Sequence, residues 1–299
     1  MSIGEGFDPT FLGPDYPIPF PTLREDTENV ALEGGKIFNF THFSIVMNRE
    51  RKFPIYGANN TDLGNKEKCN SDLRFRPDSE IGEEYQVGNC LYSNDKGVWD
   101  QGHLVKRDDV CWGELNEAVQ ANKDSFVYAN RVPQHHLFHS SMWGRIENLI
   151  TERTKPKNEK LSIFTGPIFT KKDKEYCNEK IPKCCAKIPV GFWKVVFYIS
   201  EEGNLEYAAF ILLQDCFWRK FIVEEAFHTA KYSLLEKMDV LLTYQVSLKA
   251  ITEATGIIFD EYLYEIDCFM NNCNSNTEGS NVDILEAHLI KDKEDLILG

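Results

Sequence analysis

The chain has 299 residues, of which 42% are hydrophobic and 27% are charged, a balance typical of a globular protein with one large domain or two small ones. No apolar run approaches the ~18 residues of a membrane-spanning helix, and the first residues lack a basic segment followed by an apolar one. We therefore expect no membrane partner, no signal peptide and a cytoplasmic location by default, with export by an unmarked route left open. The formal net charge of -14 argues against tight coating of nucleic acid, although a local basic groove on an acidic body suits a catalyst that must release its product.

The predicted elements begin with an N-terminal arm and a set of strands. The first 35 residues are rich in proline, glycine and aspartate and predict an extended arm, residues 1–35. Short runs that mix β-branched and aromatic residues predict five strands, at residues 40–47, 125–129, 161–164, 192–199 and 207–213. The fifth run is apolar enough to be central in a sheet.

Two helices are predicted from apolar residues at helical spacing. One spans residues 140–153, and the other spans residues 245–255 and ends before Gly256, a plausible C-cap. Helices inserted among strands without strict alternation predict an α+β fold rather than a doubly wound one. We expect one domain over residues 36–270, followed by a polar tail, residues 271–299, with a short amphipathic stretch at 282–298.

The nine cysteines are an odd number and are scattered along the chain. The closest groups are Cys184 with Cys185 and Cys268 with Cys273, and neither has a second Cys/His group at zinc-finger spacing. We therefore expect mostly reduced, partly buried thiols.

Residues with catalytic potential concentrate between Trp99 and Glu147. The sequence WDQGH at 99–103 is followed by LVKR, then by NRVPQHH at 130–136, and then by HSSMWGRIE at 139–147 on the first predicted helix. Hydrolysis of a phosphodiester needs a base for water, a divalent cation and positive charges that hold the backbone. A neutral imidazole, with a pKa near ~6.5, suits the first task. Asn, His and Glu side chains suit the second, and the candidates for the third are Lys106, Arg107, Arg131 and Arg145.

These segments resemble the DNA/RNA non-specific endonuclease family, which includes secreted bacterial nucleases and mitochondrial endonuclease G. The family pattern is Asp-Arg-Gly-His, then Asn-x-x-Pro-Gln, then Asn-x-x-x-Trp-x-x-x-Glu, and this chain has DQGH at 100–103, NRVPQ at 130–134 and HSSMWGRIE at 139–147. Further similar segments, from GFDPTFLG at 6–13 to TG at 255–256, extend the resemblance over roughly residues 6–260.

The resemblance implies a ββα-metal (His-Me finger) nuclease fold on a mixed, largely antiparallel sheet core, with residues 36–270 as the nuclease domain. By position, His103 matches the general base, and Asn130 and Glu147 match active-site residues that also serve the metal. His139 falls where the family has a metal-binding Asn. The implied cofactor is one divalent cation, Mg²⁺ or Mn²⁺.

Two departures from the family pattern concern charge and metal. Gln101 replaces the family Arg, so one positive charge aimed at the phosphate is missing, and loss of such a donor can lower the rate ~10²-fold. Lys106 or Arg107 are candidates to compensate, and Gln101 itself, Arg145 and Arg76 are further candidate phosphate ligands. Imidazole at His139 favours Mn²⁺ over Mg²⁺ more than an amide does; alternatively, His139 packs without ligating, and Asn130 or His136 ligates instead.

The sequence leaves two functions open. The first is an active endonuclease that binds the DNA and RNA backbone and hydrolyses it without sugar specificity through His103. The second is a catalytically weakened nucleic-acid-binding relative of the same fold, a reading that the glutamine at position 101 and the acidic net charge favour. The family habit and the N-terminal arm favour a homodimer.

Overall fold

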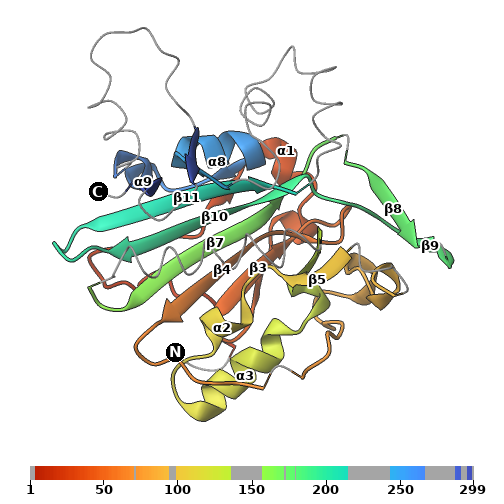
Figure 1. Cartoon of the computed structure of the whole chain (residues 1–299), viewed down its shortest axis with the longest axis horizontal. Coiled ribbons are helices and arrows are strands. Elements are labelled where there is room, and N and C mark those ends of the chain that lie inside the picture. The colour runs from red at the N-terminus through yellow and green to blue at the C-terminus, as the bar shows by residue number, and fades with distance from the viewer. Residues whose placement is uncertain are drawn as a thin grey trace, which may run out of the picture.

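An eight-stranded sheet forms the centre of the computed structural model, which describes residues 4–70, 72–93, 99–135, 157–171, 173–178, 180–214, 243–266, 287–290 and 295–297 (Figure 1). The strand order is β14-β12-β11-β10-β7-β4-β3-β2, and each neighbouring pair is antiparallel. In that order the strands span Ala287–Ile290, Thr243–Val246, Leu205–Leu213, Gly191–Ile199, Lys160–Ile168, Pro54–Asp62, Phe43–Met47 and Ile37–Asn39. The expected α+β class is confirmed.

Both faces of the sheet are buried, and strands β10 and β11 accordingly carry apolar residues at successive positions and not only at alternate ones. In β10, Trp193 and Val195 pack into a cluster with helix α8 (Leu248–Thr255), whereas Phe192 and Val196 pack into the cluster on the opposite face. Alternate side chains of a strand point to opposite faces, so one strand contributes to two cores. Figure 1 shows α8 on one side of the sheet and α2, α3 and β5 on the other.

The second face carries the elements that hold the motif residues. They are β5 (Trp99–His103), α2 (Arg107–Val110), α3 (Leu115–Ser125) and β6 (Arg131–His135). The other short elements are β1 (Thr22–Leu23), α1 (Glu25–Glu28), β8 (Glu175–Asn178), β9 (Ile181–Lys187), β13 (Ile257–Ile258), α9 (Glu261–Glu265) and the 3-10 turns Leu32–Gly34, Glu83–Tyr85, Asn89–Leu91 and Tyr128–Asn130. Among these described helices, none is long and apolar enough to cross a membrane.

Four of the five predicted strands are confirmed, with shifted ends, as β3, β7, β10 and β11. The predicted strand at 125–129 is wrong: α3 extends to Ser125, a 3-10 turn covers Tyr128–Asn130, and the strand begins only at Arg131. The buried face of α3 continues through Ala121 and Ser125, and this tertiary packing overrides the local preference of the aromatic residues that follow.

Of the two predicted helices, one lies outside the described residues, at 140–153, and the other begins later than expected. Residues 243–246 pair with β11 as strand β12, so α8 starts after Ser247, whose Oγ accepts a hydrogen bond from the Ala250 N–H at 3.1 Å. The predicted C-cap is confirmed, because Gly256 follows the helix with a φ of 76°. Of the predicted amphipathic stretch at 282–298, the described residues are β14 and 295–297.

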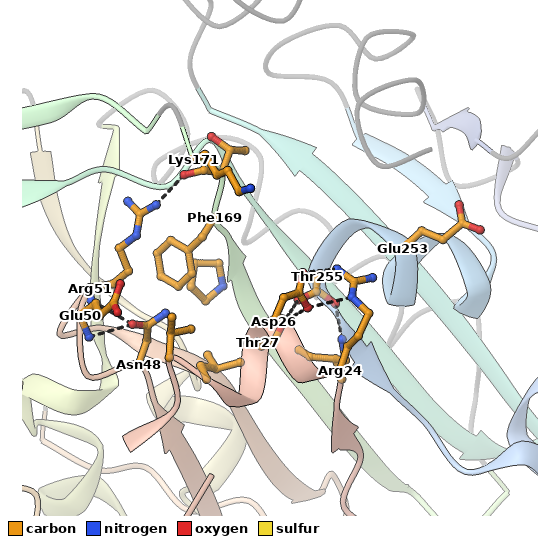
Figure 2. A pocket seen from close by; sticks show the side chains of 15 residues that line it. Arg24, Asp26, Thr27, Asn48, Glu50, Arg51, Phe169, Lys171, Glu253 and Thr255 are labelled. Atoms are coloured by element: carbon orange, nitrogen blue, oxygen red, sulfur yellow. Dashed lines mark hydrogen bonds and ion pairs between the residues drawn. The ribbon is translucent and has the colours of Figure 1, made fainter. Parts of the chain in front are cut away.

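The residues predicted as an extended arm lie along the sheet. Phe7, Phe11 and Ile18 are buried in the same cluster as α8, and β1 pairs with β13. Between this segment, the ends of β4 and β7, and the C-terminal end of α8 lies a hollow of about 640 Å³ (Figure 2). The division into arm, nuclease domain and tail stays a prediction.

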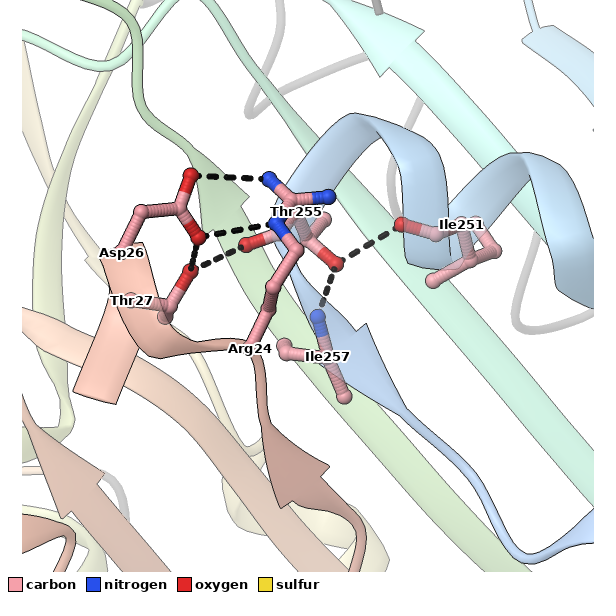
Figure 3. Close-up of polar contacts among 6 residues, drawn as sticks. All are labelled: Arg24, Asp26, Thr27, Ile251, Thr255 and Ile257. Carbon is pink, nitrogen blue, oxygen red and sulfur yellow. Dashed lines mark hydrogen bonds and ion pairs between the residues drawn. The ribbon is translucent and has the colours of Figure 1, made fainter.

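Polar contacts join the arm to the end of α8 (Figure 3). The Thr27 hydroxyl donates to the Thr255 carbonyl at 3.2 Å, and the Arg24 N–H donates to the Gly256 carbonyl at 2.7 Å. The Arg24 guanidinium is itself held by both carboxylate oxygens of Asp26, at 2.8 and 3.0 Å. The arm therefore closes one side of the fold rather than extending away from it.

Four cysteines form disulfides, so the expectation of reduced thiols is wrong for them. Cys90 is bonded to Cys184, and Cys177 is bonded to Cys185 within the β8–β9 hairpin. Pairing β8 with β9 brings Cys177 opposite Cys185, and it leaves the adjacent Cys184 to reach the 3-10 turn at Asn89–Leu91. Among the described cysteines, Cys69 and Cys111 are free thiols.

Candidate active site

The DQGH and NRVPQ motifs pair with each other as an antiparallel two-stranded ribbon, β5–β6, here called the ribbon. His103 lies opposite Arg131, Gly102 opposite Val132 and Gln101 opposite Pro133. Because side chains alternate along a strand, His103, Arg131 and Gln101 share one face of the ribbon. The opposite face carries Val132, which is buried in the sheet core.

Gly102 of the DQGH motif lies directly against the side chain of Gln134 of the NRVPQ motif. A Cβ at Gly102 would overlap the Cδ and Oε1 atoms of Gln134, whose side chain is fully buried. A similar contact docks the ribbon on the sheet, because a Cβ at Gly57 of β4 would lie 2.6 Å from Val105 Cγ2. The two motifs and the central sheet are thus fitted to one another through glycines at which a Cβ would displace a neighbouring side chain.

The imidazole of His103 is half-buried between two aromatic rings. The ring centroids of Phe75 and Phe126 each lie 4.7 Å from the centroid of His103. Phe75 is brought there by main-chain pairing, since Arg76 N–H donates to the Phe126 carbonyl at 2.9 Å and Tyr128 N–H donates to the Arg76 carbonyl at 2.8 Å. The aromatic walls orient the imidazole while leaving part of its surface accessible.

Asn130 anchors the chain that follows His103. Its Oδ1 accepts from the Val105 N–H at 2.8 Å, and its Nδ2 donates to the Val105 carbonyl at 2.9 Å and to the Ser125 carbonyl at 3.0 Å. The side chain has no exposed surface. The Leu104 N–H also donates to the Asn130 carbonyl at 2.9 Å, so the two segments are held together by side chain and main chain alike.

Arg131 is buried beside His103 in a cage of polar and aromatic groups. Its guanidinium donates to Asn89 Oδ1, Gln101 Oε1 and the Val87 carbonyl, each at 2.7 Å. Its Cζ lies 5.0, 4.5 and 4.1 Å from the ring centroids of Phe75, Tyr92 and Tyr128. Burial lowers the pKa of Arg131 from its ordinary value, which a guanidinium tolerates without losing its charge.

The other predicted phosphate ligands are partly engaged elsewhere. Arg76 has half of its side chain exposed, with a guanidinium nitrogen 3.9 Å from Asp124. Arg107, in the first turn of α2, donates to Asp108 at 2.6 Å, and Lys106 is the N-cap residue of the same helix. Arg145 lies outside the described residues.

The described part of the predicted metal site is incomplete. His139 and Glu147 lie outside the described residues, as does the helix that would complete the ββα arrangement. The one predicted ligand that is described, Asn130, has its Oδ1 engaged by the Val105 N–H and does not fit direct coordination in this conformation. Among the described residues, three potential ligands also cluster at Glu175, Cys177 and Cys185, but the two sulfur atoms are already joined as a disulfide.

Sequence reasoning missed the aromatic residues that flank the site and the partners of Arg131. Phe75 and Tyr92 come from a loop region with no periodic pattern, and no spacing rule connects them to the ribbon. The one available signal was the pairing of the two motifs, since antiparallel strands would have placed Arg131 beside His103. The hollow next to α8 includes none of the predicted site residues.

Residues 26–265 match the family of DNA/RNA non-specific endonucleases, and the chain belongs to that family. The predicted resemblance is therefore confirmed over most of the length for which it was inferred. The ribbon carrying His103 lies within the matched region.

Two relatives place the chain among known proteins. It is 31% identical over 280 residues to the uncharacterized protein y4fB of Sinorhizobium fredii (strain NBRC 101917 / NGR234), a match that covers 89% of this chain and 40% of that protein. The chain thus spans less than half the length of this relative. The fold is similar to the crystal structure of the EndoG/EndoGI complex, described as revealing the mechanism of EndoG inhibition, with a TM-score of 0.54, 14% identity, and coverage of 76% of this chain and 86% of that chain. The likeness confirms the predicted fold.

Proposed function

We propose that this chain is a divalent-metal-dependent endonuclease that hydrolyses phosphodiester bonds of DNA and RNA without sugar specificity. Family membership supports a nuclease in general. The observation that carries the more specific proposal is the position of His103, half-buried at the end of β5, between two aromatic rings and beside a buried cation.

In this proposal the His103 imidazole accepts a proton from water as the water oxygen bonds to phosphorus, the P–O bond to the leaving sugar oxygen breaks, and that oxygen takes a proton from solvent. The bound divalent cation, Mg²⁺ or Mn²⁺, supplies neutralisation of charge on the phosphate. The residues assigned to hold it are His139 and Glu147. Lys106, Arg107, Arg145 and Arg76 then serve as cations for the flanking backbone.

Asn130 has a different role from the one that the family resemblance suggested. Its three hydrogen bonds support a positioning function, in which the amide fixes Leu104 and Val105 and so the end of β5 that presents His103. Direct coordination by Asn130 would require a cation to reach an amide oxygen that has no exposed surface and already accepts the Val105 N–H. We therefore assign Asn130 to the support of the base and not to the metal.

Partners and location are also proposals. The substrate class is the DNA and RNA backbone, and a homodimer remains a prediction that light scattering after gel filtration tests. The two disulfides favour folding in an oxidising compartment over the cytoplasmic default.

A plasmid-nicking assay tests the activity. Wild-type protein should convert supercoiled plasmid and degrade RNA with Mg²⁺ or Mn²⁺ and should be inactive in EDTA. His103→Ala should lower the rate ~10²–10⁴-fold, the contribution of a general base. The matched control is His135→Ala, at the far end of the same ribbon, which should keep wild-type activity.

The alternative function has its own outcome in the same assay. A nucleic-acid-binding relative that has lost catalysis would shift the mobility of DNA without cleaving it under any metal. Cleavage that survives His103→Ala unchanged would reject the proposed role of the imidazole.

A further inference from the structure

A buried cation stands next to the position where the family pattern places an arginine. That pattern has Arg where this chain has Gln101. Arg131 lies on the neighbouring strand, on the same face of the ribbon as Gln101, and its guanidinium donates to Gln101 Oε1 at 2.7 Å. The positive charge missing from β5 is thus present on β6.

Among the residues that the structure describes, Arg131 has no anionic partner. Its hydrogen-bond partners are the amide oxygen of Asn89, the amide oxygen of Gln101 and the carbonyl of Val87, and its other neighbours are aromatic rings. Among the described residues no carboxylate lies within ion-pair distance of it. Buried guanidinium groups usually have an anionic partner. A buried guanidinium without such a partner keeps its positive charge available to attract a bound anion.

The hydrogen bond between Arg131 and Gln101 also determines which end of the amide faces outward. A guanidinium has only donors, so the atom of Gln101 that faces it must be the carbonyl oxygen Oε1. The amide nitrogen Nε2, with two N–H donors, is left on the outer side, and Gln101 is solvent-exposed. A cation bonded to the oxygen strengthens the donors of the same amide.

These observations place a donor beside the base. Gln101 and His103 are two residues apart on one strand, so their Cα atoms are ~7 Å apart and their side chains point to the same side. The Phe75 ring packs against the imidazole of His103 and against the guanidinium of Arg131, so the two groups share one wall of the site.

We propose that Arg131 and Gln101 form a relay that replaces the family arginine: Gln101 donates to the substrate phosphate, and Arg131 is the positioning residue that orients and polarises it. The inference rests on the proposed function and deepens it. Arg131 stays buried and does not itself touch the phosphate. The ligand class is a phosphodiester of single-stranded or duplex nucleic acid, recognised without base readout.

The sharpest variant is Gln101→Glu. It keeps the shape of the pair and converts the hydrogen bond with Arg131 into an ion pair, so the fold is retained. It also neutralises the cation and removes both outward donors. Arg131→Met removes the charge while leaving an unbranched side chain that fits among aromatic rings. Asn116→Glu, an exposed position in α3, controls for the change in net charge.

The assay is fluorescence anisotropy of a labelled ~12-nucleotide DNA in EDTA at several NaCl concentrations, together with KM for cleavage in Mg²⁺ or Mn²⁺. Gln101→Glu and Arg131→Met should each weaken binding ~10-fold or more and reduce the slope of log Kd against log salt by ~0.7, the loss of one phosphate contact. The double variant Gln101→Arg with Arg131→Gln should recover the slope. Asn116→Glu should change affinity less than ~3-fold, because distant exposed charges are screened.

The outcomes separate this inference from the proposed function. Wild-type affinity and slope in folded Gln101→Glu protein would overturn the relay even if the wild type cleaves. Should Arg131→Met fail to fold, Gln101→Glu alone decides. Weakened binding in the variants of a protein that never cleaves would uphold the relay and reject the nuclease, and a wild type that neither binds nor cleaves would reject both.

Discussion

The most informative single position for stability is Asn130, because its amide serves three buried main-chain groups. Replacing it with alanine leaves the Val105 N–H, the Val105 carbonyl and the Ser125 carbonyl without their partner. Each buried polar group that loses its partner costs ~1–3 kcal/mol. Because the effects of neighbouring groups are not additive, we expect a loss of ~3–5 kcal/mol, a large part of the ~5–15 kcal/mol of a typical domain.

Asn130→Asp separates the donor from the acceptor role. The variant retains an oxygen for the Val105 N–H but turns a second oxygen toward two carbonyls, so burial and repulsion raise the pKa of the new carboxyl in the folded state. Because the pKa of this carboxyl is higher in the folded than in the unfolded protein, the folded state tolerates the carboxyl only while it is protonated. Stability is therefore lost as the pH rises from the unfolded pKa to the folded pKa. Asn130→Asp should therefore lose stability relative to wild type as the pH rises above ~4, the unfolded pKa of an aspartate.

The assay is urea unfolding in EDTA, followed by tryptophan fluorescence, with Mn²⁺ binding measured on the folded fraction. Asn122→Ala is the control, since Asn122, within α3, is also buried but its side chain donates one hydrogen bond, to the Asn70 carbonyl at 2.9 Å, and the change should cost ~1–2 kcal/mol. A loss below ~1 kcal/mol for Asn130→Ala would refute the positioning role. A selective loss of Mn²⁺ affinity with unchanged stability would restore Asn130 to the metal.

Two further predictions concern the covalent and steric constraints on the site. Serine replacements that remove the Cys90–Cys184 disulfide should lower the free energy of unfolding by ~4.7 kcal/mol, against ~2.6 kcal/mol for the disulfide of the β8–β9 hairpin. The difference arises because the two disulfides close loops with sequence separations of 94 and 8 residues. Equal losses in urea unfolding without reductant would contradict this chain-entropy reasoning. Gly102→Ala should lower the melting temperature and the nuclease rate, because the added methyl group overlaps Gln134. A second change, Gln134→Ala, should recover the melting temperature in part. A fully stable Gly102→Ala protein would show that the contact can relax.

Much of the fold could be predicted from local patterns. The runs that became β7, β10 and β11 are mostly apolar on both alternate sets of positions because both faces of the sheet are covered, and such runs are evident in the sequence. Strand β4 was not predicted, because Pro54, Gly57 and two asparagines depress its local preference although it pairs centrally between β3 and β7. Its glycine is explained only by the approach of Val105 from the ribbon.

The sequence by itself indicated the family and the order of the motif residues, including the proposed base His103, because each motif is a short pattern of residue types. Tertiary structure alone decided which groups surround His103, that Asn130 is engaged by Val105, and that Arg131 faces Gln101. It also decided the disulfide pairing, which spacing does not specify. The physical reason is that these contacts join residues 8 to 94 positions apart, where the packing of strands sets which side chains meet.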